Sequence, residues 1–176
     1  MKTSIAILVA LVLALSGCGG DDAATGSGEK NAGSTTVSNP DSYFPTVSYP
    51  GGKGKRTEPV VKPWDQPAPK ELLVRDAKVG TGPVARRGDE VTIWYIGFQY
   101  NTGKIASTGW VPPASPTTIN PLGAGRTFAA MEEGIEGMRV GGRREMLVPE
   151  DRGVGEVPLL MIVELVGVKP KASPGG

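Results

Sequence analysis

The clearest alternation of apolar and polar positions lies at the centre of the chain, in Asp89–Thr108. Two sets of side chains alternate in its first half: Val91, Ile93 and Tyr95 against Thr92, Trp94 and Ile96. This period of two is typical of a half-buried strand. Asn101–Gly103 suits a hairpin turn, and the return strand begins at Ile105. The pattern predicts that Tyr95 and Ile105 face one apolar cavity from neighbouring strands.

Further strands are expected in four segments: Glu71–Lys78, Thr117–Leu122, Arg143–Val148 and Leu159–Val168. The last has the strongest pattern, because alternate apolar residues share one face: Leu159, Met161, Val163 and Leu165. Pro121 interrupts the second segment, which should therefore be short. Gly-rich and Pro-rich turns separate all of these segments.

One helix is predicted, because apolar residues recur at helical spacing. The stripe consists of Phe128, Met131, Ile135 and Met138. Thr127 is expected to be the N-cap, and Glu132 in an early turn suits the helix dipole. Several strands that favour antiparallel pairing, together with one short helix, predict an α+β fold.

The N-terminal segment Met1–Gly17 has one Lys followed by an unbroken apolar run, which fits a secretory signal peptide. Leu15–Cys18 resembles the bacterial lipobox, in which the cysteine is acylated and becomes the first residue after cleavage. An ordinary signal peptide followed by a chance cysteine is the alternative. The lipoprotein interpretation predicts an exported protein that faces outside the cytoplasm and is anchored in the bilayer by lipid on Cys18.

Residues 18–69 are expected to form a linker, flexible at first and Pro-rich over Pro40–Pro69. The Pro-rich part is interpreted as a stiff spacer or as an arm in which Trp64 packs on the domain. The folded domain is expected over residues 70–170, and residues 171–176 form a short tail.

Composition removes several classes of function. The chain has no His, which excludes Ser-His-Asp catalysis and His-ligated metals, and its single Cys allows no internal disulfide. Nineteen Lys and Arg residues balance eighteen Asp and Glu residues, so charge gives no reason to expect nucleic-acid binding. We expect neither a metal nor another cofactor.

Short motifs follow one another in a characteristic order through Glu71–Pro170. They are Gly80-Thr81-Gly82, Gly88-Asp89-Glu90-Val91, Tyr95-Ile96-Gly97, Gly103-Lys104, Leu122-Gly123, Glu132-Glu133-Gly134, Met138, Val140-Gly141-Gly142-Arg143-Arg144 and Val163-Glu164-Leu165. None is specific alone, but together they resemble the FKBP-type peptidyl-prolyl isomerases. The resemblance implies a bent antiparallel β-sheet wrapped around one short α-helix, with a proline pocket between the helix and the concave face.

The resemblance also implies a set of pocket residues. Tyr95, Phe128 and Met131 are expected to act catalytically by keeping water from the imide, without a nucleophile. Five further binding positions are implied: Ile105, Ala106, Thr127, Val154 and Met161. Ala106 stands where the family has Asp, and Val154 stands where it has a loop Tyr. The pocket is therefore expected to be apolar, shallower, and without the usual carboxylate and hydroxyl.

The implied activity is cis-trans isomerisation of proline-containing unfolded or exported polypeptides, by a monomer and at a reduced rate. Imide rotation crosses a barrier of ~20 kcal/mol without breaking a bond, so it needs no base. A catalytically silent peptide-binding or chaperone module on the same scaffold is the alternative. A third interpretation is a structural spacer whose pocket residues pack against Trp64 or Trp110. Trp110 is otherwise interpreted as a replacement wall of the pocket or as packed on the prolines of its own loop.

Overall fold

The computed structural model describes residues 39–51, 56–110, 113 and 115–172. The predicted signal peptide, Cys18 and the first part of the predicted linker lie outside the described residues. All described residues belong to one compact unit, Val37–Gly176. Within them, no helix is both long enough and apolar enough to cross a bilayer.

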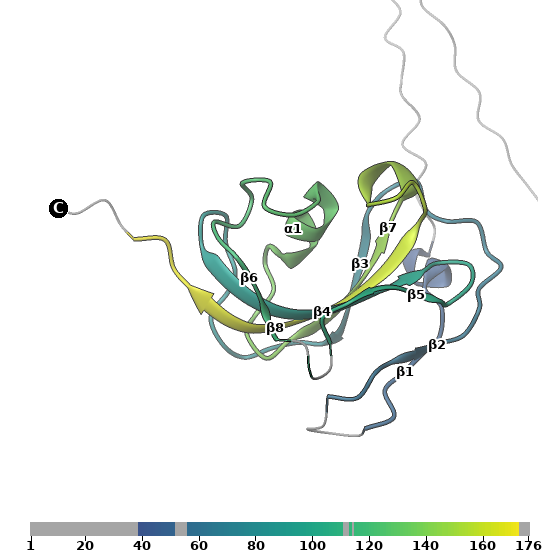
Figure 1. The fold of residues 1–176 in the computed structure, drawn as a ribbon, viewed down its shortest axis with the longest axis horizontal. Coiled ribbons are helices and arrows are strands. Elements are labelled where there is room, and N and C mark those ends of the chain that lie inside the picture. The colour runs from purple at the N-terminus through teal and green to yellow at the C-terminus, as the bar shows by residue number, and fades with distance from the viewer. Residues whose placement is uncertain (1–38, 52–55, 111–112, 114, 173–176) are drawn as a thin grey trace, which may run out of the picture. The chain divides into compact units, whose positions relative to one another are not determined.

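An antiparallel sheet forms the centre of this unit (Figure 1). Among the described residues it contains six strands: β3 (Leu73–Lys78), β4 (Glu90–Gln99), β5 (Ile105–Thr108), β6 (Thr117–Ile119), β7 (Arg143–Val148) and β8 (Leu159–Lys169). The order is β3-β7-β8-β4-β5, and β6 pairs with β4. Every strand expected from the sequence is present, with ends that differ from the prediction by at most three residues.

The two long strands β4 and β8 run side by side over the whole length of β4, from the pair Glu90–Lys169 to the pair Gln99–Leu159. The ladder is irregular between Thr92 and Ile93. Both strands are rich in β-branched and aromatic residues, which favour a pleated and buried position. The predicted α+β fold, an antiparallel sheet with one short helix, is confirmed.

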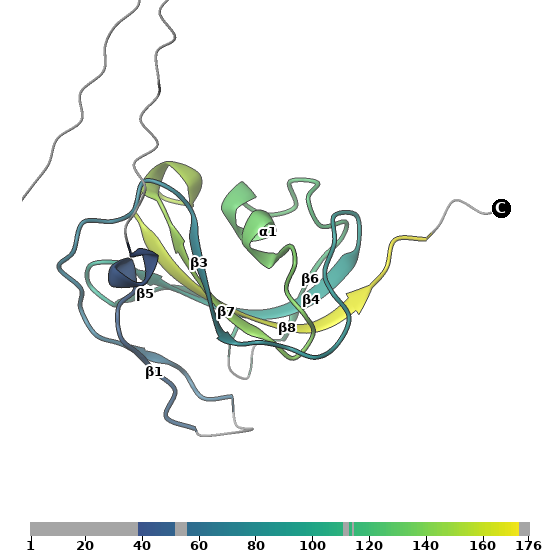
Figure 2. The same ribbon diagram turned by 180° about the vertical axis from the view of Figure 1, so that it is seen from behind.

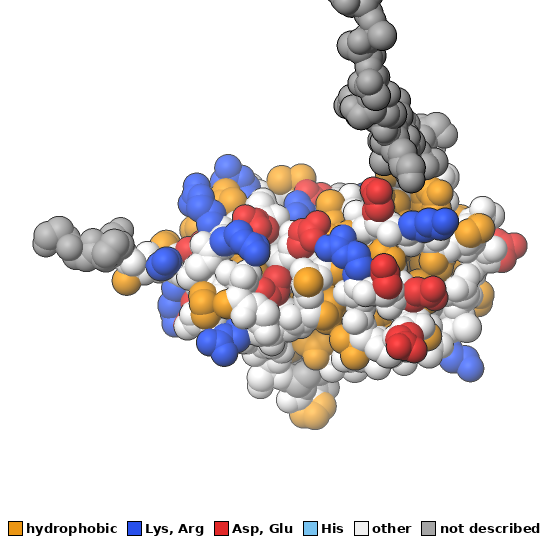
Figure 3. Space-filling view, turned by 90° about the horizontal axis from the view of Figure 1, so that it is seen from above, with side chains coloured by type: hydrophobic (Ala, Val, Ile, Leu, Met, Phe, Trp, Pro, Cys, Tyr) orange, Lys and Arg blue, Asp and Glu red, His pale blue; other side chains and the backbone are white. Residues whose placement is uncertain are grey.

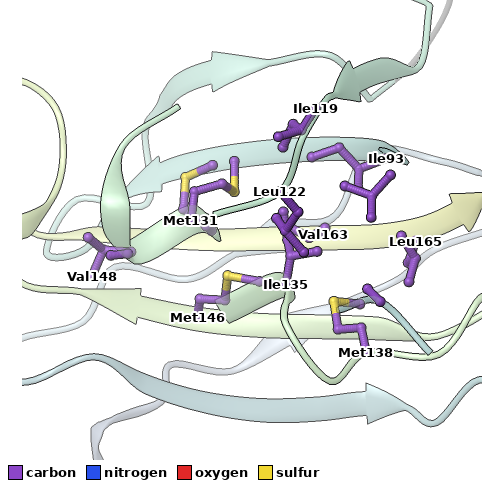
Figure 4. Packing of buried hydrophobic residues seen from close by; sticks show 14 of the residues in the cluster. Ile93, Ile119, Leu122, Met131, Ile135, Met138, Met146, Val148, Val163 and Leu165 are labelled. Carbon is purple, nitrogen blue, oxygen red and sulfur yellow. The ribbon is translucent and has the colours of Figure 1, made fainter. Parts of the chain in front are cut away.

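Helix α1 (Ala129–Ile135) covers one face of the sheet (Figures 1 and 2). Figure 4 shows Ile135 of α1 close to Val163 of β8 in the middle of the packed residues. We call the buried apolar residues on this face the helix-side cluster: Ala85, Val91, Ile93, Ile119, Leu122, Ala130, Met131, Ile135, Met138, Met146, Val148, Leu159, Met161, Val163 and Leu165.

The helix differs from its prediction at both ends. Phe128, not Thr127, is the N-cap, with an extended backbone and no side-chain hydrogen bond. The helix ends at Ile135, so Met138 is buried in the same cluster but lies beyond the helix. Gly137 has φ +81°, a left-handed conformation that stops a helix and that glycine adopts without strain.

The described residues between Asn39 and Pro69, which are 39–51 and 56–69, cover the opposite face of the sheet, and we call them the arm. The arm contains the 3₁₀ turn η1 (Pro40–Tyr43) and a small antiparallel pair formed by β1 (Val47–Ser48) and β2 (Val60–Val61). The arm packs on a second set of buried residues, the arm-side cluster: Phe44, Val61, Ile96, Phe98, Tyr100, Trp110, Leu147, Leu160 and Ile162. The second half of β4 is therefore buried on both faces rather than on one.

Buried carboxylates fasten the arm to the sheet. Glu145 of β7 is only 3% exposed, and it accepts a hydrogen bond of 2.7 Å from the hydroxyl of Tyr49 and one of 2.5 Å from Arg75. Burial first, and then the charge of Glu145, raise the pKa of Tyr49. The guanidinium of Arg75 also stacks on Phe44 at 4.3 Å.

A second carboxylate, Glu164 of β8, pairs with Arg56 of the arm at 3.1 Å and with Arg143 of β7 at 2.9 Å. Burial acts to raise the pKa of Glu164, but the two guanidinium groups outweigh it and hold the pKa below its usual range. Arg56 also stacks on Trp94 at 4.2 Å. The arm is thus held by apolar burial, by ion pairs and by cation–π contacts together.

Candidate functional site

Two methionines of the predicted pocket are buried in the core. Met131 of α1 is 3% exposed and Met161 of β8 is 2% exposed, and both belong to the helix-side cluster. The sulfur of Met161 lies directly over Gly97, where an added Cβ atom would be only 2.6 Å away. A residue larger than glycine at position 97 would therefore displace Met161.

Tyr95 lies two residues before Gly97 on the same face of β4 and packs, partly exposed, against the helix-side cluster. Its ring also contacts the backbone at Gly109, where an added Cβ atom would be 3.0 Å from Cε1. The amide of Gly109 donates a hydrogen bond of 2.9 Å to the carbonyl of Tyr95. The ring is thus held between the core and the chain that leaves β5.

The other two members of the predicted set, Thr127 and Phe128, lie just before α1. Both are partly buried, and Phe128 packs against the helix-side cluster. The structure therefore brings Tyr95, Phe128, Met131 and Met161 to one cluster. Tyr95 and Phe128 are partly exposed, whereas the two methionines are buried.

A carboxylate on the helix organises the loop that carries Thr127 and Phe128. Glu132 accepts hydrogen bonds from the backbone amides of Gly125, Arg126 and Thr127 at 3.1, 2.6 and 3.0 Å. Burial acts to raise the pKa of Glu132, but these donors outweigh it and place the pKa below its usual range.

Thr127 belongs to this loop and does not cap the helix. Its amide donates to Glu132, and the helix begins after Phe128. The sequence pattern indicated only that Glu132 suits the helix dipole, not that it holds this loop. An acid placed shortly after a glycine-rich loop, Gly123–Gly125, was the available signal.

Ile105 and Ala106 lie on β5 with exposed side chains, and Ile105 is 45% exposed. The strand register pairs Ile105 with Phe98, which belongs to the arm-side cluster, and the ladder is irregular beside this pair. Gly109, rather than Ile105, is the neighbour that contacts the ring of Tyr95. A common cavity for Tyr95 and Ile105 remains a prediction.

Val154 lies in the loop between the 3₁₀ turn η2 (Glu150–Arg152) and β8 and is 64% exposed. An ion pair of 2.5 Å between Arg152 and Glu133 ties this turn to α1. Glu156 has φ +52°, a conformation that is uncommon for a residue other than glycine and that marks a tightly constrained loop.

The two tryptophans considered for the pocket lie in the other cluster. Trp110 is fully buried among the arm-side residues. Its indole N–H donates a hydrogen bond of 2.8 Å to the carbonyl of Thr57 in the arm. Trp64 is partly buried against the same cluster. The interpretation of Trp110 as a pocket wall is therefore wrong, because the arm supplies a closer apolar partner on the far side of the sheet.

The four side chains that the structure brings to one cluster, Tyr95, Phe128, Met131 and Met161, carry no charge. Within the residues that the structure describes, no group of three acidic or thiol side chains is arranged to hold a metal ion. Figure 3 shows that acidic and basic side chains are interspersed with apolar ones on the face seen from above. Such a site can remove water from a bound imide, which favours the twisted transition state without proton transfer.

The fold and this apolar set define a class of isomerase that acts by enclosing an imide rather than by covalent chemistry. The family model for FKBP-type peptidyl-prolyl cis-trans isomerases matches residues 82–170. The chain is 35% identical over 116 residues to an FK506-binding protein of Streptomyces anulatus, which covers 63% of this chain and 81% of the relative. It is 38% identical over 89 residues to a probable FK506-binding protein of Corynebacterium glutamicum, covering 51% and 72%.

The crystal structure of AtFKBP13 shares the fold, with a TM-score of 0.50, 24% identity, and coverage of 58% of this chain and 96% of that chain. FkpA from Escherichia coli also matches with a TM-score of 0.50 and 22% identity, covering 57% of this chain and 49% of that chain. The chain belongs to the FKBP-type peptidyl-prolyl cis-trans isomerase family. It is a peptidyl-prolyl isomerase, as the resemblance implied.

Proposed function

We propose that this isomerase is an exported lipoprotein that acts on proline-containing polypeptides outside the cytoplasm, as a monomer anchored through acylated Cys18. The observation that carries the proposal is the sequence Leu15–Cys18, which follows a single Lys and then an unbroken apolar run. Acyl chains on one residue supply the two-chain anchoring that a single chain does not.

Metabolic labelling with a fatty-acid analogue in a bacterial host tests the anchor. Because Cys18 is the only cysteine, label on the wild-type chain that is lost in Cys18→Ser reports on this residue alone. Ser16→Ala, which keeps a small residue in the motif, is the matched control and should still be labelled. A wild-type chain that is cleaved and released without label is an ordinary secreted protein, and that result would overturn the proposal.

We further propose that the activity is weak, because the pocket lacks two polar groups that the family provides. Ala106 and Val154 replace the carboxylate and the hydroxyl, and each lost contact in the transition state is worth ~1–3 kcal/mol. If they add, two such losses amount to about 2–6 kcal/mol and lower the rate by roughly 30-fold to more than 10,000-fold.

A proline-peptide isomerisation assay measures this rate directly. The wild-type rate should exceed the uncatalysed rate, and Ala106→Asp with Val154→Tyr should raise it. Because both side chains are exposed, these substitutions fit without disturbing the core. A wild-type rate equal to the uncatalysed rate would favour the silent peptide-binding module. Unchanged activity in the double variant would remove the explanation by lost polar groups.

A further inference from the structure

The edge strand beside the site, β5, lacks the features that usually protect a sheet edge from pairing with another strand. β5 (Ile105–Thr108) is the outermost strand on its side, and no strand among the described residues pairs with its outer edge. All four side chains are exposed, and none is charged or a proline. Edge strands usually carry charges or prolines, because a bare edge recruits another strand.

The opposite edge of the same sheet provides an internal comparison. β3 has six residues against four in β5, and it carries three charged residues: Arg75, Asp76 and Lys78. Two of them are engaged in ion pairs with carboxylate or guanidinium groups of β7, as in the Asp76–Arg144 pair at 2.7 Å. Among the described strands, β3 therefore places charged side chains along one edge of the sheet, whereas β5 at the other edge has none.

The peptide groups of β5 alternate in direction. The amide of Gly109 donates to Tyr95 at 2.9 Å, and Ser107 pairs with Gly97 two residues further along. In an antiparallel ladder, hydrogen-bonded pairs recur every second residue, so Ser107 directs its N–H and C=O toward β4. The same alternation turns the N–H and C=O of Thr108 outward.

The open edge lies beside the site. Gly109, which directly follows β5, contacts the ring of Tyr95. Ser107 is paired with Gly97, over which the sulfur of Met161 lies, so Ser107 is on the site face of the sheet. A strand added at β5 would therefore present every second side chain on the face that carries the site.

We propose that β5 binds an extended segment of the substrate polypeptide, adjacent to its proline, as an additional antiparallel strand. This inference rests on the isomerase function and specifies how that site holds a long substrate. The occupant must be extended chain, since the edge offers main-chain donors and acceptors and no charge. Main-chain pairing is largely independent of sequence and so suits unfolded clients of varied composition.

The test uses the full chain and an unstructured proline-containing peptide of about a dozen residues. Two matched peptides each replace one backbone N–H with an ester oxygen, at adjacent positions beside the proline. Only the N–H that faces β5 contributes a bond, so one ester should weaken binding roughly 3–10-fold and its neighbour should leave affinity unchanged. The amide of Thr108 should gain protection from hydrogen exchange, whereas the amide of Val74 on β3 should not change.

Several outcomes would overturn the proposal. Equal effects of the two esters, or binding without protection at Thr108, would show that the substrate does not extend β5. Protection at Thr108 that grows with protein concentration in the absence of peptide would assign the edge to a second copy of this chain. A proline tetrapeptide is too short to reach along β5, so its turnover reports the isomerase function alone. Turnover of the tetrapeptide, together with binding of the longer peptide without protection at Thr108, would overturn only this inference. No turnover and no binding would remove both this inference and the isomerase function.

Discussion

The loop that carries Thr127 and Phe128 depends on one carboxylate, so Glu132→Gln is an informative change. Glutamine keeps the size of the side chain but replaces one accepting oxygen with an amide that donates. If the oxygen keeps the bonds to Arg126 and Thr127, the amide of Gly125 loses its acceptor. The two remaining hydrogen bonds also change from charged to neutral.

The expected fall in the free energy of unfolding follows from these losses. A hydrogen bond to a charged group contributes ~1.5–3 kcal/mol, whereas a neutral one contributes about 1 kcal/mol. Because Gly125 is exposed and water can partly replace its lost partner, we expect the free energy of unfolding to fall by about 2 kcal/mol at neutral pH. Urea unfolding followed by tryptophan fluorescence measures it, with linear extrapolation to water.

The pH dependence gives a second readout. The folded-state pKa of Glu132 lies below its usual value of 4.5, so the ionised carboxylate stabilises the fold above that pH. As pH falls through the lowered pKa, wild type loses this stabilisation and its advantage over Glu132→Gln should shrink. Glu133→Gln is the control. Glu133 is exposed, so the loss of its ion pair with Arg152 should lower the free energy of unfolding by less than about 1 kcal/mol. Equal stability of the Glu132 variant and wild type at neutral pH would refute the reasoning.

Three further changes test the two faces of the sheet separately. Tyr95→Ala should lower the rate of proline-peptide isomerisation at least about ten-fold, since it opens the site to water; an unchanged rate would place the site elsewhere. Tyr49→Phe removes a donor from buried Glu145 and should lower the free energy of unfolding by ~1–3 kcal/mol in urea, and a loss below about 0.5 kcal/mol would contradict this. Trp110→Phe leaves the carbonyl of Thr57 without its donor and should destabilise by a similar amount while the isomerisation rate stays constant; a fall in rate at equal folded fraction would restore its role as a pocket wall.

Periodicity predicted β4, β8 and the helix well, because each of them buries a face defined locally. The alternation from Leu159 to Leu165 holds in β8, whose helix-side residues are all buried. The N-cap was predicted one residue too early, because a Thr before an apolar run satisfies the local rule. The loop before the helix is held by Glu132, whose carboxylate accepts from the backbone amides of Gly125, Arg126 and Thr127.

The docking of the arm was much harder to predict. Its aromatic residues, such as Phe44 and Tyr49, are scattered among prolines and show no period, so no face could be assigned to them. Their partners Ile96 and Ile162 are distant in the sequence, and β4 alone does not reveal that its second face is covered. Burial of Trp110 under the arm depends on the same long-range contact, which explains why its role was misjudged.

The covered second face has a practical consequence for where the folding unit begins. The family match starts at residue 82, and a fragment cut there would lose every arm residue of the arm-side cluster. It would also expose the buried members of this cluster that lie outside the arm, among them Ile96, Phe98, Leu160 and Ile162. A contiguous apolar patch of this kind promotes association. A fragment begun at Asn39 should therefore remain dispersed, whereas one begun at residue 82 should self-associate even though it contains the whole region that the family model matches.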